Sequence, residues 1–421
     1  MAEPFLYKEI QWYWERQNKE PPPITQLLRT LVFRPHLAVY VRKLHMDGHV
    51  YTRYENRHTC SEIAVPCHEL DDLIAAIQRT GVPFRDTWIQ ELRHGSIYAV
   101  VALLLAQLPN LRCLYLNGAF TRQTTVIGMV LRSALCEPNG YELPKFQHLQ
   151  EVSFLMPQWE DEARDALAFF YLRNIERISA LIENAPQFKW PGVQPPLLSK
   201  LKALDLTHIR QKYLGKLLLV TPNLTSLRWF WYYDLGVRDD FITRTVELDQ
   251  IPSALSHVRS SLTELTLKAA CEAGANTHWY PGVKVNGSLS GIADFDMVKR
   301  FQVPLVFLVG FSRNPATRLR DVVPRNVELL IITDDLKVQN VDDVEPDCPQ
   351  WEWDDCAIIN SLSSWPEDAA EFTPHLRQVR LLFSDIWHDE NEWPSEMRDR
   401  LREVGARVGV QVELIDLQAE M

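Results

Sequence analysis

The stretch LPNLRCLYL, residues 108–116, contains the pattern that recurs along this chain. A Pro-Asn pair that favours a turn precedes Leu111, two residues separate Leu111 from Leu114, and Leu114 alternates with Leu116. Alternation of apolar with other residues is typical of a short strand that buries one face. We therefore expect Leu111 to pack the turn, and Leu114 and Leu116 to point from a strand into the core.

The same spacing of three apolar residues occurs at nine places in the sequence. Similar lead-ins with a turn former precede several of them, as in TPNLTSLRW from Thr221 and TPHLRQVRL from Thr373. The nine triplets are Val41, Leu44 and Met46; Leu111, Leu114 and Leu116; Leu149, Val152 and Phe154; Leu201, Leu204 and Leu206; Leu224, Leu227 and Trp229; Leu262, Leu265 and Leu267; Val298, Phe301 and Val303; Val327, Leu330 and Ile332; Leu376, Val379 and Leu381.

Helical spacing of apolar residues appears between these triplets. The predicted helices are marked by Leu70, Leu73, Ile74 and Ile77, with Gly81 as a stop; by the apolar stripe within 97–108; and by Met397, Leu401 and Val404. Strands that alternate with helices predict parallel strands joined by right-handed crossovers.

The distance between successive triplets decides which parallel fold we expect. It ranges from 23 residues (Leu201 to Leu224) to 70 (Val41 to Leu111), whereas regular leucine-rich repeats have about 20–29 residues. We predict an α/β fold, an irregular leucine-rich-repeat solenoid or horseshoe, with a parallel sheet on the concave face and helices outside. Residues 1–35 would be an N-terminal helical cap, and 36–421 a divergent array. The alternative is an open parallel α/β sheet in which the spacing arises by chance.

Composition excludes several classes of protein. The 421 residues carry a net charge of -11, with 44 Lys and Arg against 55 Asp and Glu, which argues against a nucleic-acid partner. Apolar runs such as 98–106 are too short to span a membrane, and no secretory signal is visible. Seven scattered cysteines fit reduced thiols. We expect a cytoplasmic or nuclear protein without a membrane partner.

The N-terminal region resembles a known family. LYKEIQWYWE from Leu6, a proline turn at 21–23 and LLRTLVFRPHLAVYVRKLHMDG from Leu27 are similar to fungal F-box proteins with divergent leucine-rich repeats. The likeness continues at GSLSGIADFDMVKRFQVPLVFLVGF from Gly287 and at LRDVVPRNVELLIITDDL from Leu319. This resemblance implies a substrate-recognition subunit of a cullin-RING ubiquitin ligase, whose F-box docks on the ligase adaptor.

The F-box itself is expected before Pro4, so only its last helix, residues 6–14, would be present here. The alternative is an amphipathic N-terminal helix whose aromatic side chains cover the open end of the first repeat. In either case we expect this chain not to bind the adaptor tightly. The ligase role would require an F-box upstream of Met1.

No motif of a known enzyme class is found. The sequence contains no phosphate loop, GxGxxG, GxSxG or HExxH. His58, Cys60, Cys67 and His68 are potential zinc ligands, but six residues separate the cysteines, and we expect a loop that enters a helix at Glu69. We therefore predict no metal, no cofactor and no catalytic residue. An enzyme with an unrecognised site is the remaining alternative.

Carboxylates are concentrated between residues 334 and 355, where Lys337 is the single cation. A run of like charges is typical of a solvated loop. We expect a solvated acidic loop, and the alternative is a docking surface for a basic partner.

The sequence WFWYY, 229–233, contains the best candidate for partner contact. Because side chains alternate along a strand, Trp229 is expected in the core, with Arg228 and Phe230 on the opposite face. Arginine and aromatic side chains dominate binding hot spots. The expected concave face includes Ala203, Asp205, Thr207, Ser226, Arg228, Phe230, Glu264, Thr266 and Lys268. We predict that it binds an unidentified protein partner.

Two aromatic residues, Trp279 and Tyr280, mark a second predicted contact site. They lie in a glycine-rich stretch, 273–291, that we expect to be a long irregular insertion. The alternative is that these two aromatics fix the loop to the array. For Phe230, the alternative to partner contact is packing beneath a following loop.

Overall fold

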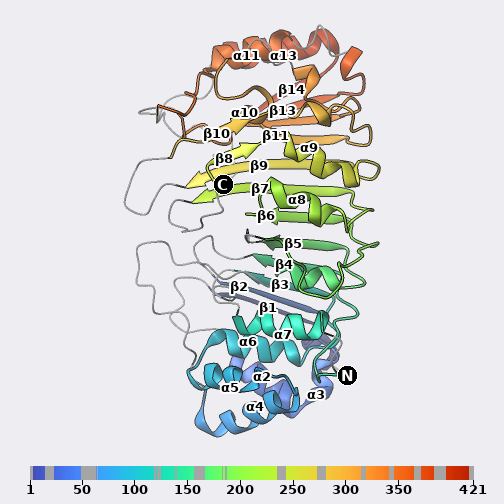
Figure 1. Ribbon diagram of the computed structural model, residues 1–421, viewed down its shortest axis with the longest axis vertical. Coiled ribbons are helices and arrows are strands. Elements are labelled where there is room, and N and C mark those ends of the chain that lie inside the picture. Colours follow the sequence, from blue (N-terminus) through green and yellow to red (C-terminus); the bar gives the residue numbers. More distant parts are fainter. Residues whose placement is uncertain are drawn as a thin grey trace. The chain divides into compact units, whose positions relative to one another are not determined.

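The chain forms two compact units, Met1–Leu204 (unit 1) and Asp205–Met421 (unit 2), in a computed structural model (Figure 1). Each unit is an α/β assembly in which helices alternate with parallel strands. The structure describes residues 3–14, 23–48, 63, 65–117, 120, 125–137, 140–155, 166–182, 184, 187–234, 243–272, 281–313, 319–340, 346–364, 371–383 and 395–416.

Parallel strands make up the framework of both units. Unit 1 contains β1 (Glu9–Trp14), β2 (Lys43–Gly48), β3 (Cys113–Asn117), β4 (Glu151–Leu155) and β5 (Arg177–Leu181), each paired with the next. Unit 2 contains β7 (Ser226–Asp234), β9 (Glu264–Glu272), β11 (Arg300–Pro304), β12 (Leu329–Thr333), β13 (Gln378–Phe383) and β14 (Gln411–Asp416), paired likewise. The unit boundary falls within β6 (Ala203–Thr207).

Within each unit the neighbouring strands lie side by side in the order in which they occur along the chain, as predicted for the α/β class. In unit 2, β8 (Thr245–Glu247) and β10 (Lys284–Asn286) form a separate parallel pair. Strictly parallel neighbours require crossover connections, which the intervening helices and loops supply.

Helices occupy most of these connections. Unit 1 contains α1 (Glu3–Leu6), α2 (Ile24–Phe33), α3 (Pro35–Ala38), α4 (Cys67–Arg79), α5 (Arg85–Arg93), α6 (Ile97–Ala106), α7 (Thr125–Leu135) and the 3-10 helix η2 (Ala166–Tyr171). Unit 2 contains α8 (Gln211–Leu218), α9 (Gln250–Leu255), α10 (Leu305–Val309), α11 (Asp355–Ser364), α13 (Ser395–Val408) and the 3-10 helices η3 (Ser256–Val258), η4 (Ser290–Ile292) and η5 (Leu319–Asp321).

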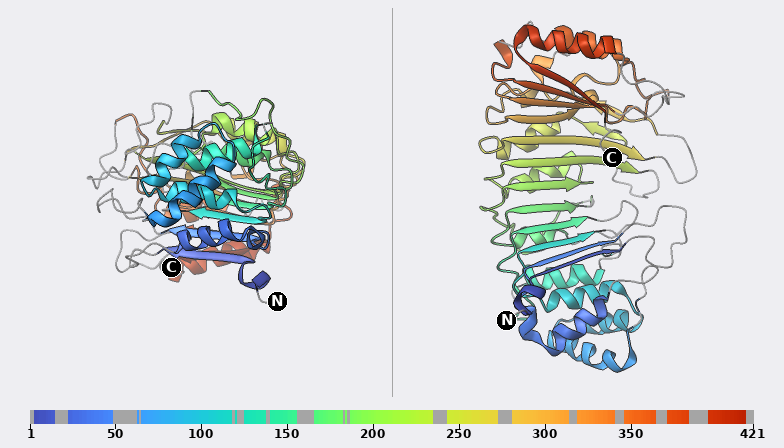
Figure 2. Two further views of the ribbon diagram at one scale, coloured as in Figure 1. Left: turned by 90° about the horizontal axis from the view of Figure 1, so that it is seen from below. Right: turned by 180° about the vertical axis from the view of Figure 1, so that it is seen from behind.

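One face of β7 and β9 carries helices and the other does not. Helices α8 and α9 contact each other and lie against one face of these strands (Figure 1). The view from behind shows the second face of β7 and β9 with no described helix over it (Figure 2). We call this second face the open face.

The repeated apolar triplets form the core, as the sequence pattern predicted. Every member of the nine triplets is at most 7% exposed. The strands align these positions: Leu114 of β3 pairs with Val152 of β4, and Leu265 of β9 pairs with both Leu227 of β7 and Phe301 of β11. Full burial of one such side chain contributes about 1.5–3 kcal/mol, so these stacks dominate the packing.

A recurring hydrogen-bond pattern explains the two-residue gap after the first apolar position. The carbonyl oxygen of Arg42 accepts from the backbone N–H groups of Arg112 (2.7 Å) and Cys113 (3.1 Å), where β3 begins. In unit 2 the carbonyl of Thr225 accepts from Thr263 (2.9 Å) and from the next residue in the same way. These hydrogen bonds fix the register of each strand at its start, just ahead of the apolar side chains that point into the core.

The predicted N-terminal helix over residues 6–14 is wrong. Residues Glu9–Trp14 form β1, which pairs in parallel with β2, and Ile10 and Trp12 align with Leu44 and Met46. Aromatic and β-branched side chains favour strands, and pairing with β2 overrides the expected helical pattern. The division into 1–35 and 36–421 remains a prediction.

The three predicted helices are confirmed, with two differences. Helix α4 begins at Cys67, two residues before the expected start at Glu69, and Gly81 follows it with φ of 71°. Helix α6 is buried from Ile97 to Leu105 on all sides because α2, α5 and α7 contact it. The sequence pattern predicted burial of one face of this helix only, whereas all of its faces are buried.

Gly95 lies just before α6, where its backbone closely approaches that of Ile63. Its φ is 73°, its carbonyl accepts from Ile63 N–H (2.6 Å), and an added Cβ would lie 2.7 Å from the Ile63 oxygen. We expect Gly95→Ala to lower the free energy of unfolding by about 2–3 kcal/mol. Gly81 has a similar φ, but an added Cβ would have no atom within 4 Å. We therefore expect Gly81→Ala to lower the free energy of unfolding by only about 1 kcal/mol. Equal losses in urea denaturation would contradict the predicted clash.

Candidate functional site

The open face of β7 and β9 carries the predicted contact residues. Arg228 pairs in register with Thr266, and Phe230 with Lys268. Trp229 is fully buried on the opposite face, and its indole nitrogen donates to the Ile209 carbonyl (2.8 Å). Arg228 is exposed and Phe230 half-buried. The predicted orientation of these side chains is therefore confirmed.

Charged side chains surround Phe230 on the open face. The Arg228 guanidinium lies 3.7 Å from the Asp205 carboxylate. Burial raises the pKa of Asp205, while Arg228 and Lys268 act in the opposite direction. Ser226 Oγ donates to Glu264 Oε2 (3.2 Å), which orients that exposed carboxylate.

We call Asp205, Arg228, Phe230, Glu264 and Lys268 the contact surface. The structure places all five on β6, β7 and β9 within unit 2. None of them is fully buried, and Arg228 and Glu264 are exposed. Their chemistry, two cations and two carboxylates around one aromatic ring, suits binding of a polar surface with an apolar centre.

The second predicted contact site is not placed by the structure. Trp279 and Tyr280 lie outside the described residues. The end of the expected irregular insertion is ordered, because Lys284–Asn286 forms β10 and pairs with β8. The prediction of irregular structure throughout 273–291 is therefore wrong for this part.

An aromatic cluster supports Phe230 from the end of β7. The Tyr232 ring meets Phe230 edge-on at 5.8 Å and stacks on His208 at 5.5 Å. The backbone N–H of His208 donates to the Phe230 carbonyl (3.2 Å). Burial, and secondarily the charge of Arg210, lowers the pKa of His208 to about 4. Sequence reasoning did not identify His208, which lies just beyond a triplet and shows no motif.

The acidic segment 334–355 is more than the solvated loop that we expected. The Asp335 carboxylate accepts from the backbone N–H of Ala269 (2.7 Å), and burial raises its pKa. Asp354 accepts from the Ala357 N–H (2.7 Å) at the start of α11 and pairs with Arg313 (2.7 Å). These carboxylates connect the segment to β9 and to Arg313, which follows α10. Its residues 341–345 lie outside the described part.

The potential zinc ligands cannot be assembled from the described residues. His58 and Cys60 lie outside them, and Cys67 is the first residue of α4. No group of three or more His, Cys, Asp or Glu side chains in the described ranges is placed to hold a metal ion. None of the described helices combines the length and the apolar character needed to cross a membrane.

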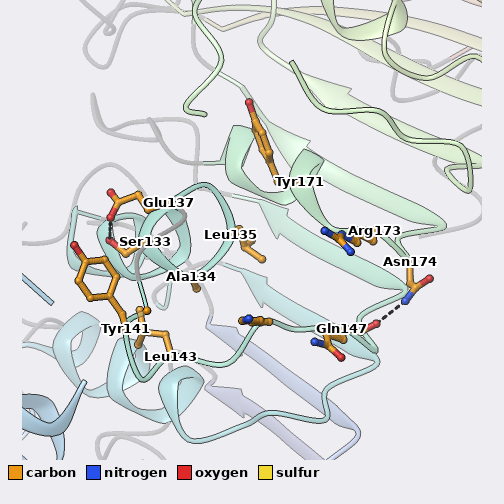
Figure 3. A pocket seen from close by; sticks show the side chains of 12 residues that line it. Ser133, Ala134, Leu135, Glu137, Tyr141, Leu143, Gln147, Tyr171, Arg173 and Asn174 are labelled. Atoms are coloured by element: carbon orange, nitrogen blue, oxygen red, sulfur yellow. Dashed lines mark hydrogen bonds between the residues drawn. The ribbon is translucent and has the colours of Figure 1, made fainter. Parts of the chain in front are cut away.

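A pocket of about 550 Å³ lies in unit 1 (Figure 3). The end of α7, the segment that leads into β4 and the segment between η2 and β5 form its walls. Its lining residues are Ser133, Ala134, Leu135, Glu137, Gly140, Tyr141, Leu143, Lys145, Gln147, Tyr171, Arg173 and Asn174. Sequence reasoning missed this pocket because its residues lie in connections outside the triplets.

No protein-family model and no curated protein matches the chain. The resemblance to fungal F-box proteins with leucine-rich repeats therefore stays a prediction. Because fold alone does not determine function, the contact surface and the pocket are the features that indicate what this chain binds.

Proposed function

We propose that this protein is a non-enzymatic interaction module that binds a protein partner through the contact surface on the open face of unit 2. The observation that carries the proposal is the pair Arg228 and Phe230, adjacent on β7 and accessible from a face that no described helix covers. Arginine and aromatic residues contribute most to the hot spots of protein interfaces.

The repeated strand units support a leucine-rich-repeat-like solenoid as the architecture behind this function. Nine apolar triplets are buried, and paired strands align them position by position. In repeat proteins of this kind each unit contacts its neighbours, and the exposed strand residues build an extended surface for partners. The residues between the triplet positions point away from the core, so substitutions there can change the binding surface without changing the core.

The charge pattern favours a protein over a nucleic acid as the partner. Arg228 is balanced by Asp205 at 3.7 Å, and the exposed Glu264 adds a second carboxylate. A nucleic-acid site would need a basic footprint, which this surface does not provide. Mixed charges around an aromatic centre are typical of the rim and core of protein interfaces.

Replacement of Phe230 by alanine tests the proposal. We expect Phe230→Ala to weaken partner binding by about 2 kcal/mol or more, because a central aromatic anchor is lost. The chain would be tagged, proteins captured from cells identified by quantitative mass spectrometry, and the affinity of the best candidate measured with purified protein.

Leu219→Ala is the control, since Leu219 is 63% exposed at the end of α8 and lies outside the contact surface. We expect it to retain the partner, and Arg228→Ala to lose it. Unchanged binding by Phe230→Ala together with a large fall in melting temperature would place Phe230 in the core and contradict the proposal.

A further inference from the structure

Two cations, Lys145 and Arg173, line the unit 1 pocket. Lys145 and Arg173 are both exposed, and neither side chain has an ion pair or hydrogen bond within the described residues. In the view of Figure 3 the Arg173 side chain lies between the side chains of Leu135 and Asn174. In a chain of net charge -11, two cations at one pocket that have no partner among the described residues make a local site for an anion.

The wall beside these cations is held by hydrogen bonds. The Tyr171 hydroxyl donates to the Gln194 carbonyl (2.7 Å) and accepts from Gly192 N–H (3.1 Å). Asn174 donates to the Gln147 carbonyl (2.7 Å) and accepts from the Lys200 ammonium (2.6 Å). A ligand would therefore meet a pocket that is already formed, which lowers the entropic cost of binding.

Apolar and aromatic residues form another part of the lining, beside the polar Ser133, Glu137, Gln147 and Asn174. Ala134 and Leu135 are half-buried, Leu143 is buried, and Tyr171 is also among the lining residues. The Glu137 carboxylate accepts from Ser133 Oγ (3.1 Å) on the side of the pocket away from Arg173 (Figure 3). Its negative charge disfavours a second anionic group at that end, and the volume suits a small molecule.

We propose that this pocket binds a small organic anion, a phosphate or carboxylate joined to an apolar body of about the size of one ring. Arg173 and Lys145 hold the anion, because a guanidinium fork and an ammonium are the usual partners of such groups. Leu135, Leu143 and the Tyr171 ring contact the apolar body. This inference does not depend on the proposed protein partner, since the contact surface lies in unit 2.

Calorimetric titration of the full chain tests the inference with phenyl phosphate and benzoate as probes. We expect saturable binding of at least one of them, and the two arms distinguish a phosphate from a carboxylate site. Inorganic phosphate and phenol, which each lack one half of the ligand, should bind at least about tenfold more weakly.

Variants locate the site. Arg173→Gln and Lys145→Gln should each weaken the bound probe at least about tenfold, since each removes a charge-assisted hydrogen bond. Arg85→Gln, an exposed arginine of α5 outside the pocket, should leave the affinity unchanged. Gly192→Ala should also weaken binding, because its Cβ would lie 2.7 Å from the Tyr171 ring.

Three results would overturn the inference. The first is no saturable binding of either probe, and the second is inorganic phosphate binding as tightly as phenyl phosphate. The third is an affinity that Arg173→Gln and Lys145→Gln leave unchanged while both variants keep the wild-type melting temperature.

Discussion

Trp229→Ala is expected to lower the free energy of unfolding by about 3–5 kcal/mol, which is the range for removing a large aromatic side chain from a core. Trp229 is fully buried among the triplet residues. Its indole N–H donates to the Ile209 carbonyl at 2.8 Å, and the variant leaves that carbonyl without this donor. Urea denaturation followed by circular dichroism measures the loss.

The neighbouring residue supplies the matched control. Phe230 follows Trp229 on β7 but lies on the open face, half-buried, with a ring contact to Tyr232 at 5.8 Å. We expect Phe230→Ala to cost about 1 kcal/mol or less in stability. Similar losses for the two variants would mean that the faces of β7 are not divided into core and surface.

Acidification is expected to destabilise unit 2 through His208. Burial and Arg210 lower the pKa of this side chain from 6.5 to about 4 in the folded protein. Between these values the unfolded chain binds a proton that the folded chain does not, so stability falls as pH decreases from 6.5 to 4. At 1.36 kcal/mol per pH unit the loss is at most about 3 kcal/mol. Below pH 4 this contribution no longer changes.

The variant His208→Asn isolates this contribution. The φ of His208 is 76°, a conformation that asparagine adopts more readily than most residues. Asp205 and Asp335 have raised pKa values, so both carboxylates make stability rise as pH falls. Both remain in the variant. We therefore expect the difference between wild type and His208→Asn in urea denaturation to change with pH between 6.5 and 4. A constant difference would contradict the buried, neutral histidine.

The parallel core could be predicted from the sequence because the same three positions recur with a fixed spacing. Leucine, valine and phenylalanine at these positions, as in Leu111, Leu114 and Leu116, are buried in every triplet. The strand β5 was missed because Ala180 stands at the last apolar position, where a small residue weakens the signal. The alternation in β1 was read as helical because pairing with β2 is a long-range contact.

The candidate sites were predictable only in part. The side of β7 on which Arg228 and Phe230 lie follows from strand alternation, so the sequence alone identified it. The binding of Asp335 to the Ala269 N–H joins residues that are 66 positions apart, and no local pattern predicts it. The same applies to the pocket, where Lys145 and Arg173 come from different connections. Contacts between residues that are far apart in the chain produce no periodic pattern in the sequence.

Hydroxyl-radical footprinting of the chain, alone and with its captured partner, shows which face of unit 2 the partner covers. We expect the partner to protect Phe230 from oxidation on the open face. Leu219, which is 63% exposed at the end of α8, should react equally in both samples. Protection of Leu219 with unchanged oxidation of Phe230 would place the partner on the helical side and contradict the account.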